Sequence, residues 1–152
     1  MEIKLYFLNE KADPGLMDCR AVKPVTRTIP RAEGVARAAL LDLLKGVTPE
    51  EASAGFVSFE PEMTSGILKN IKIKNGAAYI NFDKIVYDKL GAATSSCGGG
   101  LFASIEATLE QFKTIKKGKI FYAIDGSPRD FYELVQVGEC PKALKNCDGR
   151  LF

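Results

Sequence analysis

Apolar and polar residues alternate from Asn70 to Asp83, and this pattern predicts a β-hairpin with Asn75-Gly76 at its turn. Asn-Gly favours a two-residue type I′ turn, because both central residues of that turn need positive φ. Lys74 then faces Ala77, and the remaining pairs follow outward along the two strands. One face of the hairpin carries Ile71, Ile73, Ala78, Ile80 and Phe82. The other face carries Lys72, Lys74, Tyr79 and Asn81.

Apolar residues at helical spacing predict two main helices, Arg31–Lys45 and Leu101–Phe112. In the first of them, Pro30 is placed to open the helix and Gly46 to end it. Capping signals, one of them a Thr-Pro-Glu-Glu capping box, predict two short helices between these. The short helices are Thr48–Ala54 and Asp83–Leu90.

Alternating or β-branched segments predict further strands at Glu2–Asn9, Cys19–Ile29 and Lys119–Asp125. Pro24 has no amide donor, so the second of these strands belongs at an edge or a bulge. Phe131–Val137 is expected to be a last strand or an irregular apolar segment. This order of elements predicts an α/β (α+β) fold, in which a mixed β-sheet carries the two main helices on one face. We expect one domain over residues 1–137, followed by a C-terminal extension over residues 138–152.

Composition excludes several kinds of chemistry without identifying a function. The chain has 152 residues, 46% of them hydrophobic, and a net charge of +2, which is typical of one globular domain and too small to indicate nucleic-acid binding. It contains no His, so a Ser-His or Cys-His catalytic pair is excluded. No stretch is long and apolar enough to span a bilayer, and Met1-Glu2-Ile3 leads directly into a strand. We therefore expect either a cytosolic protein or one whose leader has been removed.

Five segments, in order and at plausible spacing, resemble the sporulation and spore-germination (GerMN) domain family over about Glu2 to Gly126. They are the opening strand Ile3–Phe7, the strand Val25–Pro30, the helix end Ala39–Gly46, the hairpin Asn75–Phe82, and Ile105–Gly126 with its Ile-Asp-Gly ending. The resemblance implies a GerMN-like fold. It also implies a non-catalytic interaction or assembly module of the cell envelope, outside the cytoplasm and often anchored as a lipoprotein.

The resemblance supplies no catalytic residue, cofactor or metal site. It implies a protein or an envelope polymer as the partner and does not lead us to expect nucleic acid. Contact with a membrane is expected only through an N-terminal anchor that precedes this sequence.

Four cysteines allow three pairings. The resemblance favours a disulfide between Cys19 and Cys97, which leaves Cys140 to pair with Cys147. Such bridges fit an oxidising compartment, whereas buried free thiols would fit a cytosolic protein. In an alternative hypothesis, Cys97 precedes a helix N-terminus and acts as a redox thiol of lowered pKa. A Cys-x-x-Cys motif is absent, however, and the six residues between Cys140 and Cys147 are an unusual spacing for zinc.

Lysines form two basic groups in the sequence, and these suggest a third function, the binding of an anionic or carbohydrate polymer of the envelope. The groups are Lys69, Lys72 and Lys74, and Lys113, Lys116, Lys117 and Lys119. Solvated lysines along a sheet edge explain the same residues without a ligand. On the hairpin, Lys72, Lys74 and Tyr79 are the candidate partner-contact residues. Gly98–Gly100 could hold an anion before a helix, although a loop that turns the backbone explains these glycines as well.

Overall fold

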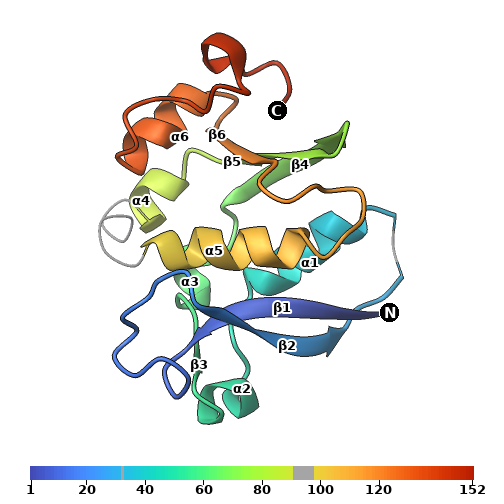
Figure 1. The fold of residues 1–152 in the computed structure, drawn as a ribbon, viewed down its shortest axis with the longest axis vertical. Helices are drawn as coiled ribbons and strands as arrows, with labels where there is room; N and C mark the ends of the chain where they lie inside the picture. The colour runs from blue at the N-terminus through green and yellow to red at the C-terminus, as the bar shows by residue number, and fades with distance from the viewer. Residues whose placement is uncertain (32, 91–97) are drawn as a thin grey trace.

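The strands form two three-stranded sheets in a computed structural model that describes residues 1–31, 33–90 and 98–152 (Figure 1). Sheet A consists of β1 (Glu2–Asn9), β2 (Val22–Thr28) and β3 (Phe56–Val57), in the order β2-β1-β3 with antiparallel neighbours. Sheet B consists of β4 (Leu68–Lys74), β5 (Ala77–Phe82) and β6 (Ile120–Ile124) in that order. In sheet B, β4 and β5 are antiparallel, whereas β5 and β6 are parallel.

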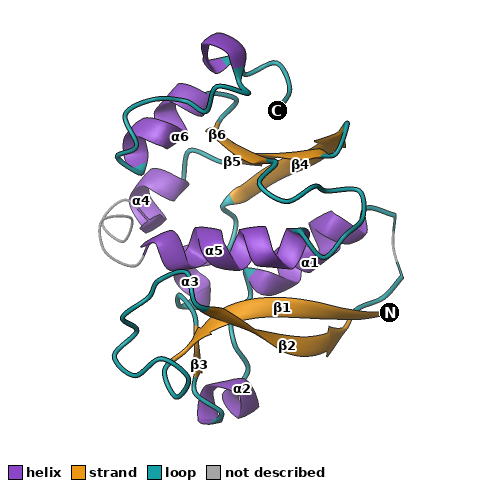
Figure 2. Cartoon of the chain, in the orientation of Figure 1, coloured by secondary structure: helices purple, strands orange, loops and turns teal. Residues whose placement is uncertain are grey.

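The two longest helices lie between the two sheets in the view of Figure 2. They are α1 (Val35–Leu43) and α5 (Gly98–Leu109), and they pack against each other and against β1. The shorter helices are α2 (Pro49–Ser53), α3 (Pro61–Thr64), α4 (Val86–Leu90), α6 (Pro128–Leu134) and the 3₁₀ turn η2 (Lys145–Cys147). None of the helices described in the structure is long and apolar enough to cross a membrane.

The α+β fold class is confirmed, but the strands do not join into the single mixed sheet that the sequence pattern predicted. In each sheet the central strand, β1 or β5, pairs with the two other strands of its own sheet, and no described strand pairs with a strand of the other sheet. At the outer edge of sheet A, Pro24 lies in β2 opposite Tyr6 and cannot donate to a further strand. The edge position expected for the Pro24 strand is therefore confirmed.

The predicted hairpin is confirmed residue by residue. Asn75 and Gly76 have φ of 51° and 80°, as a type I′ turn requires, and Lys74 pairs with Ala77. The expected apolar face is less uniform than predicted, because Ile73, near the turn at the end of β4, is 41% exposed. Asn81, expected on the polar face, is buried and accepts a hydrogen bond of 2.8 Å from the Gly126 amide.

Helix boundaries depart from the sequence prediction at three places. The first main helix begins at Val35 and not next to Pro30, because Gly34 takes a left-handed φ of 75° just before it. The second runs from Gly98 to Leu109 and so includes the glycines that were expected in a loop. The segment Phe131–Val137 is not a strand, because Ser127 caps α6 by accepting a hydrogen bond of 3.2 Å from the Asp130 amide.

One hydrophobic core joins both sheets and the helices between them. Its largest fully buried apolar side chains are Leu5, Leu40, Ile67, Ile80, Phe82, Leu90, Ile105, Leu109 and Ile124. The C-terminal extension also contributes, because Leu144 and Phe152 are buried within the same core. Residues 138–152 are thus packed on the rest of the chain.

Candidate functional site

An apolar pocket of about 200 Å³ opens at the end of sheet A where β1 finishes. Five separate parts of the chain line it: β1, the β1–β2 loop, the end of α1, the β3–α3 segment, and the start of α5. The described lining residues are Phe7, Leu8, Leu16, Leu43, Gly46, Val57, Ser58, Phe59, Thr64, Gly100, Leu101 and Ser104. We call this the sheet A pocket.

The close contact of α5 with β1 forms one wall of the sheet A pocket. A Cβ atom placed on Gly100 would lie 2.8 Å from Leu8 Cδ1, a distance that side chains do not adopt. Gly100 therefore lets the helix start directly against the strand. Leu8 and Leu101 are both buried at this contact, so the floor of the pocket is apolar and fixed.

The polar side chains of the pocket are largely used to hold its walls. The Ser58 hydroxyl accepts a hydrogen bond of 3.0 Å from the Val47 amide and donates one of 3.2 Å to the Phe59 carbonyl. The Thr64 hydroxyl donates to the Leu44 carbonyl at 2.6 Å. None of the described residues that line the pocket has a charged or titratable side chain. The pocket therefore suits an apolar group and offers no acid or base for proton transfer.

A partly buried ion cluster supports the helix ends behind the pocket. The Arg27 guanidinium donates to Glu51 Oε1 at 2.5 Å, to Asp42 Oδ2 at 3.2 Å and to the Gly46 carbonyl at 2.7 Å. It also lies 5.6 Å from the centre of the Phe7 ring. Burial alone would raise the pKa of Glu51, but hydrogen bonds from Arg27 and from the Thr48 backbone outweigh it and hold this pKa below its ordinary value.

A second buried group of titratable side chains lies in the aromatic layer between α5, β6 and α6. The Tyr122 hydroxyl donates to Glu106 Oε1 at 3.3 Å, and Arg20 pairs with the other Glu106 oxygen at 2.6 Å. Burial, with the neighbouring Glu106 charge, raises the pKa of Tyr122 well above its ordinary value. Burial also raises the pKa of Tyr132 to about 12. Both phenols therefore stay protonated and act as hydrogen-bonding groups of the core.

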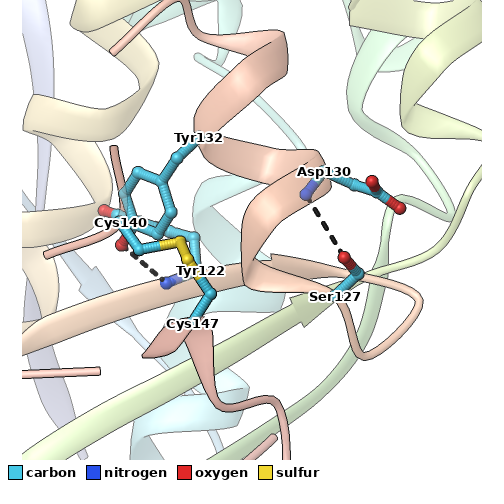
Figure 3. Close-up of a disulfide and its surroundings, with 6 residues drawn as sticks. All are labelled: Tyr122, Ser127, Asp130, Tyr132, Cys140 and Cys147. Atoms are coloured by element: carbon cyan, nitrogen blue, oxygen red, sulfur yellow. Dashed lines mark hydrogen bonds between the residues drawn. A yellow bond between two sulfur atoms is a disulfide. The ribbon is translucent and has the colours of Figure 1, made fainter. Parts of the chain in front are cut away.

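The cysteines expected to pair within the C-terminal extension do form a disulfide, Cys140–Cys147 (Figure 3). It lies beside Tyr132, whose hydroxyl accepts a hydrogen bond of 3.3 Å from the Tyr122 amide. Cys19 is also disulfide-bonded. Cys97 lies outside the described residues, and so does the redox function suggested for it. Among the described residues, no group of three His, Cys, Asp or Glu side chains could hold a metal ion.

The candidate partner-contact residues of the hairpin have different surroundings. Tyr79 stacks on Phe121 with ring centres 5.6 Å apart and meets the edge of Phe152 at 5.4 Å. Lys72 and Lys74 are both exposed, and Lys72 donates to the Phe152 carbonyl at 2.8 Å. The C-terminal residues therefore cover part of the face that the sequence pattern left open. No sequence signal had indicated that Phe152 would return to this sheet.

Similarity to known proteins extends over most of the chain. Residues 4–130 match the family described as sporulation and spore germination. A search of curated proteins finds no match. The fold is similar to that of the first GerMN domain of the sporulation protein GerM from Bacillus subtilis, with a TM-score of 0.54 and 22% identity over 83% of this chain and 84% of that chain. The tandem GerMN domains of the same protein give a TM-score of 0.58 and 22% identity, over 83% of this chain and 39% of that chain.

Proposed function

The chain belongs to the sporulation and spore germination family, and we propose that it acts there as a non-catalytic interaction module of the cell envelope. The observation that carries this proposal is the sheet A pocket, whose described lining is apolar and uncharged. In this function, the pocket receives an apolar side chain of a partner protein. Apolar anchors that fill a pocket of the partner commonly supply most of the energy of an interface.

The size of the pocket supports a side chain as its occupant. Sites for whole small molecules commonly enclose roughly 300–1,000 Å³. The sheet A pocket, at about 200 Å³, is smaller than this range. One leucine, methionine or phenylalanine side chain from another protein matches it better than a complete cofactor or metabolite.

The disulfides support a location outside the cytoplasm. Cys140 and Cys147 are bridged, and such bonds persist mainly in oxidising compartments. Alkylation of intact cells before lysis tests this location, because cysteines that are already oxidised resist the reagent. Rapid labelling of Cys140 and Cys147 in freshly opened cells would contradict it.

Filling the pocket tests the docking function. Ser104 is buried on α5 and lines the pocket, so Ser104→Leu places an apolar side chain into the space that the partner would occupy. Ser104→Ala is the matched control, since it removes the same hydroxyl and leaves the pocket open. The readout is complementation of a deletion strain by the full-length gene, scored as spore formation and germination.

We expect Ser104→Leu to unfold at an unchanged or higher temperature, because it fills empty space, while it loses complementation. Ser104→Ala should complement like the unchanged protein. Full complementation by a folded Ser104→Leu protein would overturn the docking function. Equal loss of complementation in both variants would also overturn it, because the effect would then come from removing the Ser104 hydroxyl and not from filling the pocket.

A further inference from the structure

Two lysine groups that are separate in the sequence meet at the turn end of sheet B. Lys74 ends β4 and pairs with Ala77, and Lys119 directly precedes β6. The Ala78 amide donates to the Lys119 carbonyl at 2.8 Å, so Lys74 and Lys119 flank the start of β5 from its two sides. Two interstrand spacings separate their backbones by roughly 10 Å, and the register directs both side chains to the same face.

The turn before β6 is fixed against the tip of the hairpin. The Lys116 amide donates to the Gly76 carbonyl at 2.8 Å, and the Lys119 amide donates to the Lys116 carbonyl at 3.1 Å. A Cβ atom on Gly76 would lie 3.0 Å from the Lys116 methylene groups, so the lysine stem already packs on the turn. This contact holds Lys116 and Lys117 beside Lys74. We call Lys74, Lys116, Lys117 and Lys119 the lysine cluster.

The positive charge of the lysine cluster is not neutralised by ion pairs. All four side chains are exposed, and none of them has an ion pair with another described residue. A nearby acid, Glu110, accepts a hydrogen bond of 2.9 Å from the Gly118 amide. Lys69, on the same strand as Lys74, is by contrast paired with Asp125. The cluster thus presents several cationic groups to solvent on one end of the sheet.

We propose that the lysine cluster binds a linear polymer of phosphodiester-linked polyol. Ammonium groups act as point charges that suit phosphate, and several of them close together can contact successive phosphates of a repeating anion. Nucleic acid fits less well, because proteins that bind single strands add aromatic side chains on which the bases stack. Tyr79, the aromatic residue of β5, is already packed against Phe121 and Phe152.

The choice of a polymer without bases rests on the proposed function, which locates the domain outside the cytoplasm. The charge geometry itself does not depend on the sheet A pocket. The binding of the polymer by the lysine cluster and the docking of a partner in the sheet A pocket can therefore be refuted separately. A Ser104→Leu protein should bind the polymer as the unchanged protein does, since Ser104 belongs to α5 and lines the pocket at sheet A.

The test compares two triple variants of equal net charge. Lys74→Gln/Lys117→Gln/Lys119→Gln removes the cluster but keeps Lys116, whose methylenes support the hairpin turn. The control, Lys23→Gln/Lys142→Gln/Lys145→Gln, removes three other exposed lysines. Binding of poly(glycerol phosphate) is measured by calorimetry over a range of salt concentrations. A single-stranded DNA oligomer and anionic phospholipid vesicles are the comparison ligands.

We expect the cluster variant to lose on the order of 100-fold in affinity at low salt. The slope of log affinity against log salt should fall by about 2 to 3. The control should keep both the affinity and the slope within about twofold of the unchanged protein. Absence of binding to poly(glycerol phosphate) would overturn the proposal, as would equal losses in both variants. Binding confined to DNA or to vesicles would also overturn it.

Discussion

Replacing Arg27 with alanine removes the cation that joins β2 to the ends of α1 and α2. The guanidinium reaches Glu51 at 2.5 Å, Asp42 at 3.2 Å and the Gly46 carbonyl at 2.7 Å. The side chains of Arg27, Asp42 and Glu51 are only 15%, 16% and 14% exposed. Arg27→Ala therefore leaves the poorly hydrated carboxylate of Glu51 without a cation, and leaves Asp42 paired only with the exposed Lys45, at 3.1 Å.

The expected cost follows from this geometry. Breaking a fully buried ion pair by removing one partner costs about 3–5 kcal/mol. The remaining exposure lets water reach Glu51 and Asp42, so we expect the free energy of unfolding to fall by about 2–3 kcal/mol. In a domain of this length, such a loss lowers the melting temperature by about 5–10 °C.

Urea unfolding followed by circular dichroism measures this loss, and Arg150→Ala is the control. Arg150 also pairs with a carboxylate, Asp148 at 2.8 Å, but its side chain is 89% exposed. Its removal should therefore change stability by less than about 0.5 kcal/mol. A double-mutant cycle of Arg27→Ala with Glu51→Ala should give a coupling energy of at least about 1 kcal/mol. A coupling near zero, or an Arg27→Ala effect as small as that of Arg150→Ala, would refute the reasoning.

The effect of Arg27→Ala should also depend on pH. Because the folded-state pKa of Glu51 lies below its unfolded value, the pair contributes fully above the unfolded pKa, near 4.5. This contribution is lost as the pH falls through the lower, folded-state pKa. The stability difference between the unchanged protein and Arg27→Ala should therefore be constant from neutral pH to about pH 5 and shrink in more acidic solution. A difference that grows on acidification would contradict this assignment.

Two further predictions concern α6 and the aromatic layer. Ser127→Ala removes the cap of α6 and should lower the free energy of unfolding by about 1 kcal/mol in urea unfolding, whereas Ser127→Asp, which can still cap, should not. Burial raises the pKa of Tyr122 and that of Tyr132, the latter to about 12, and it also raises the pKa of the more exposed Tyr87. Ultraviolet titration should therefore find that the two core phenols, Tyr122 and Tyr132, ionise last. The contribution of these phenols to stability is present below about pH 10 and is lost as the pH rises through their folded-state pKa values. Ionisation of all five tyrosines in one step near pH 10 would contradict this prediction.

The elements that local pattern could predict are those whose signal lies within a few residues. Alternation predicted the strand Glu2–Asn9 correctly, and Asn75-Gly76 determined the register of the hairpin from the Lys74–Ala77 pair to the Ile71–Ile80 pair. The capping box at Thr48 also forms as predicted. In α6, Ser127-Pro128 was a helix start signal of the same kind. The apolar residues that follow it suggested a strand or an irregular segment, and the helix was not predicted.

The sheet A pocket and the lysine cluster could not be predicted in this way. The pocket combines Phe7, Leu43, Val57 and Leu101, which come from four separate segments. The cluster depends on the parallel pairing of β5 with β6, which is a contact between distant parts of the chain. Residue type alone gave no indication of either juxtaposition. The two lysine groups were visible in the sequence, but their meeting at one end of sheet B was not.

The claim that the pocket receives a side chain of a partner protein is tested most directly by photocrosslinking in sporulating cells. A photoreactive phenylalanine analogue is introduced at Phe59 in the pocket wall, or at Lys23 on the exposed face of β2 as a control. We predict a covalent adduct with one protein from position 59 alone, and its loss when Ser104→Leu fills the pocket. An adduct that persists in the filled pocket, or one that forms equally from position 23, would contradict the account.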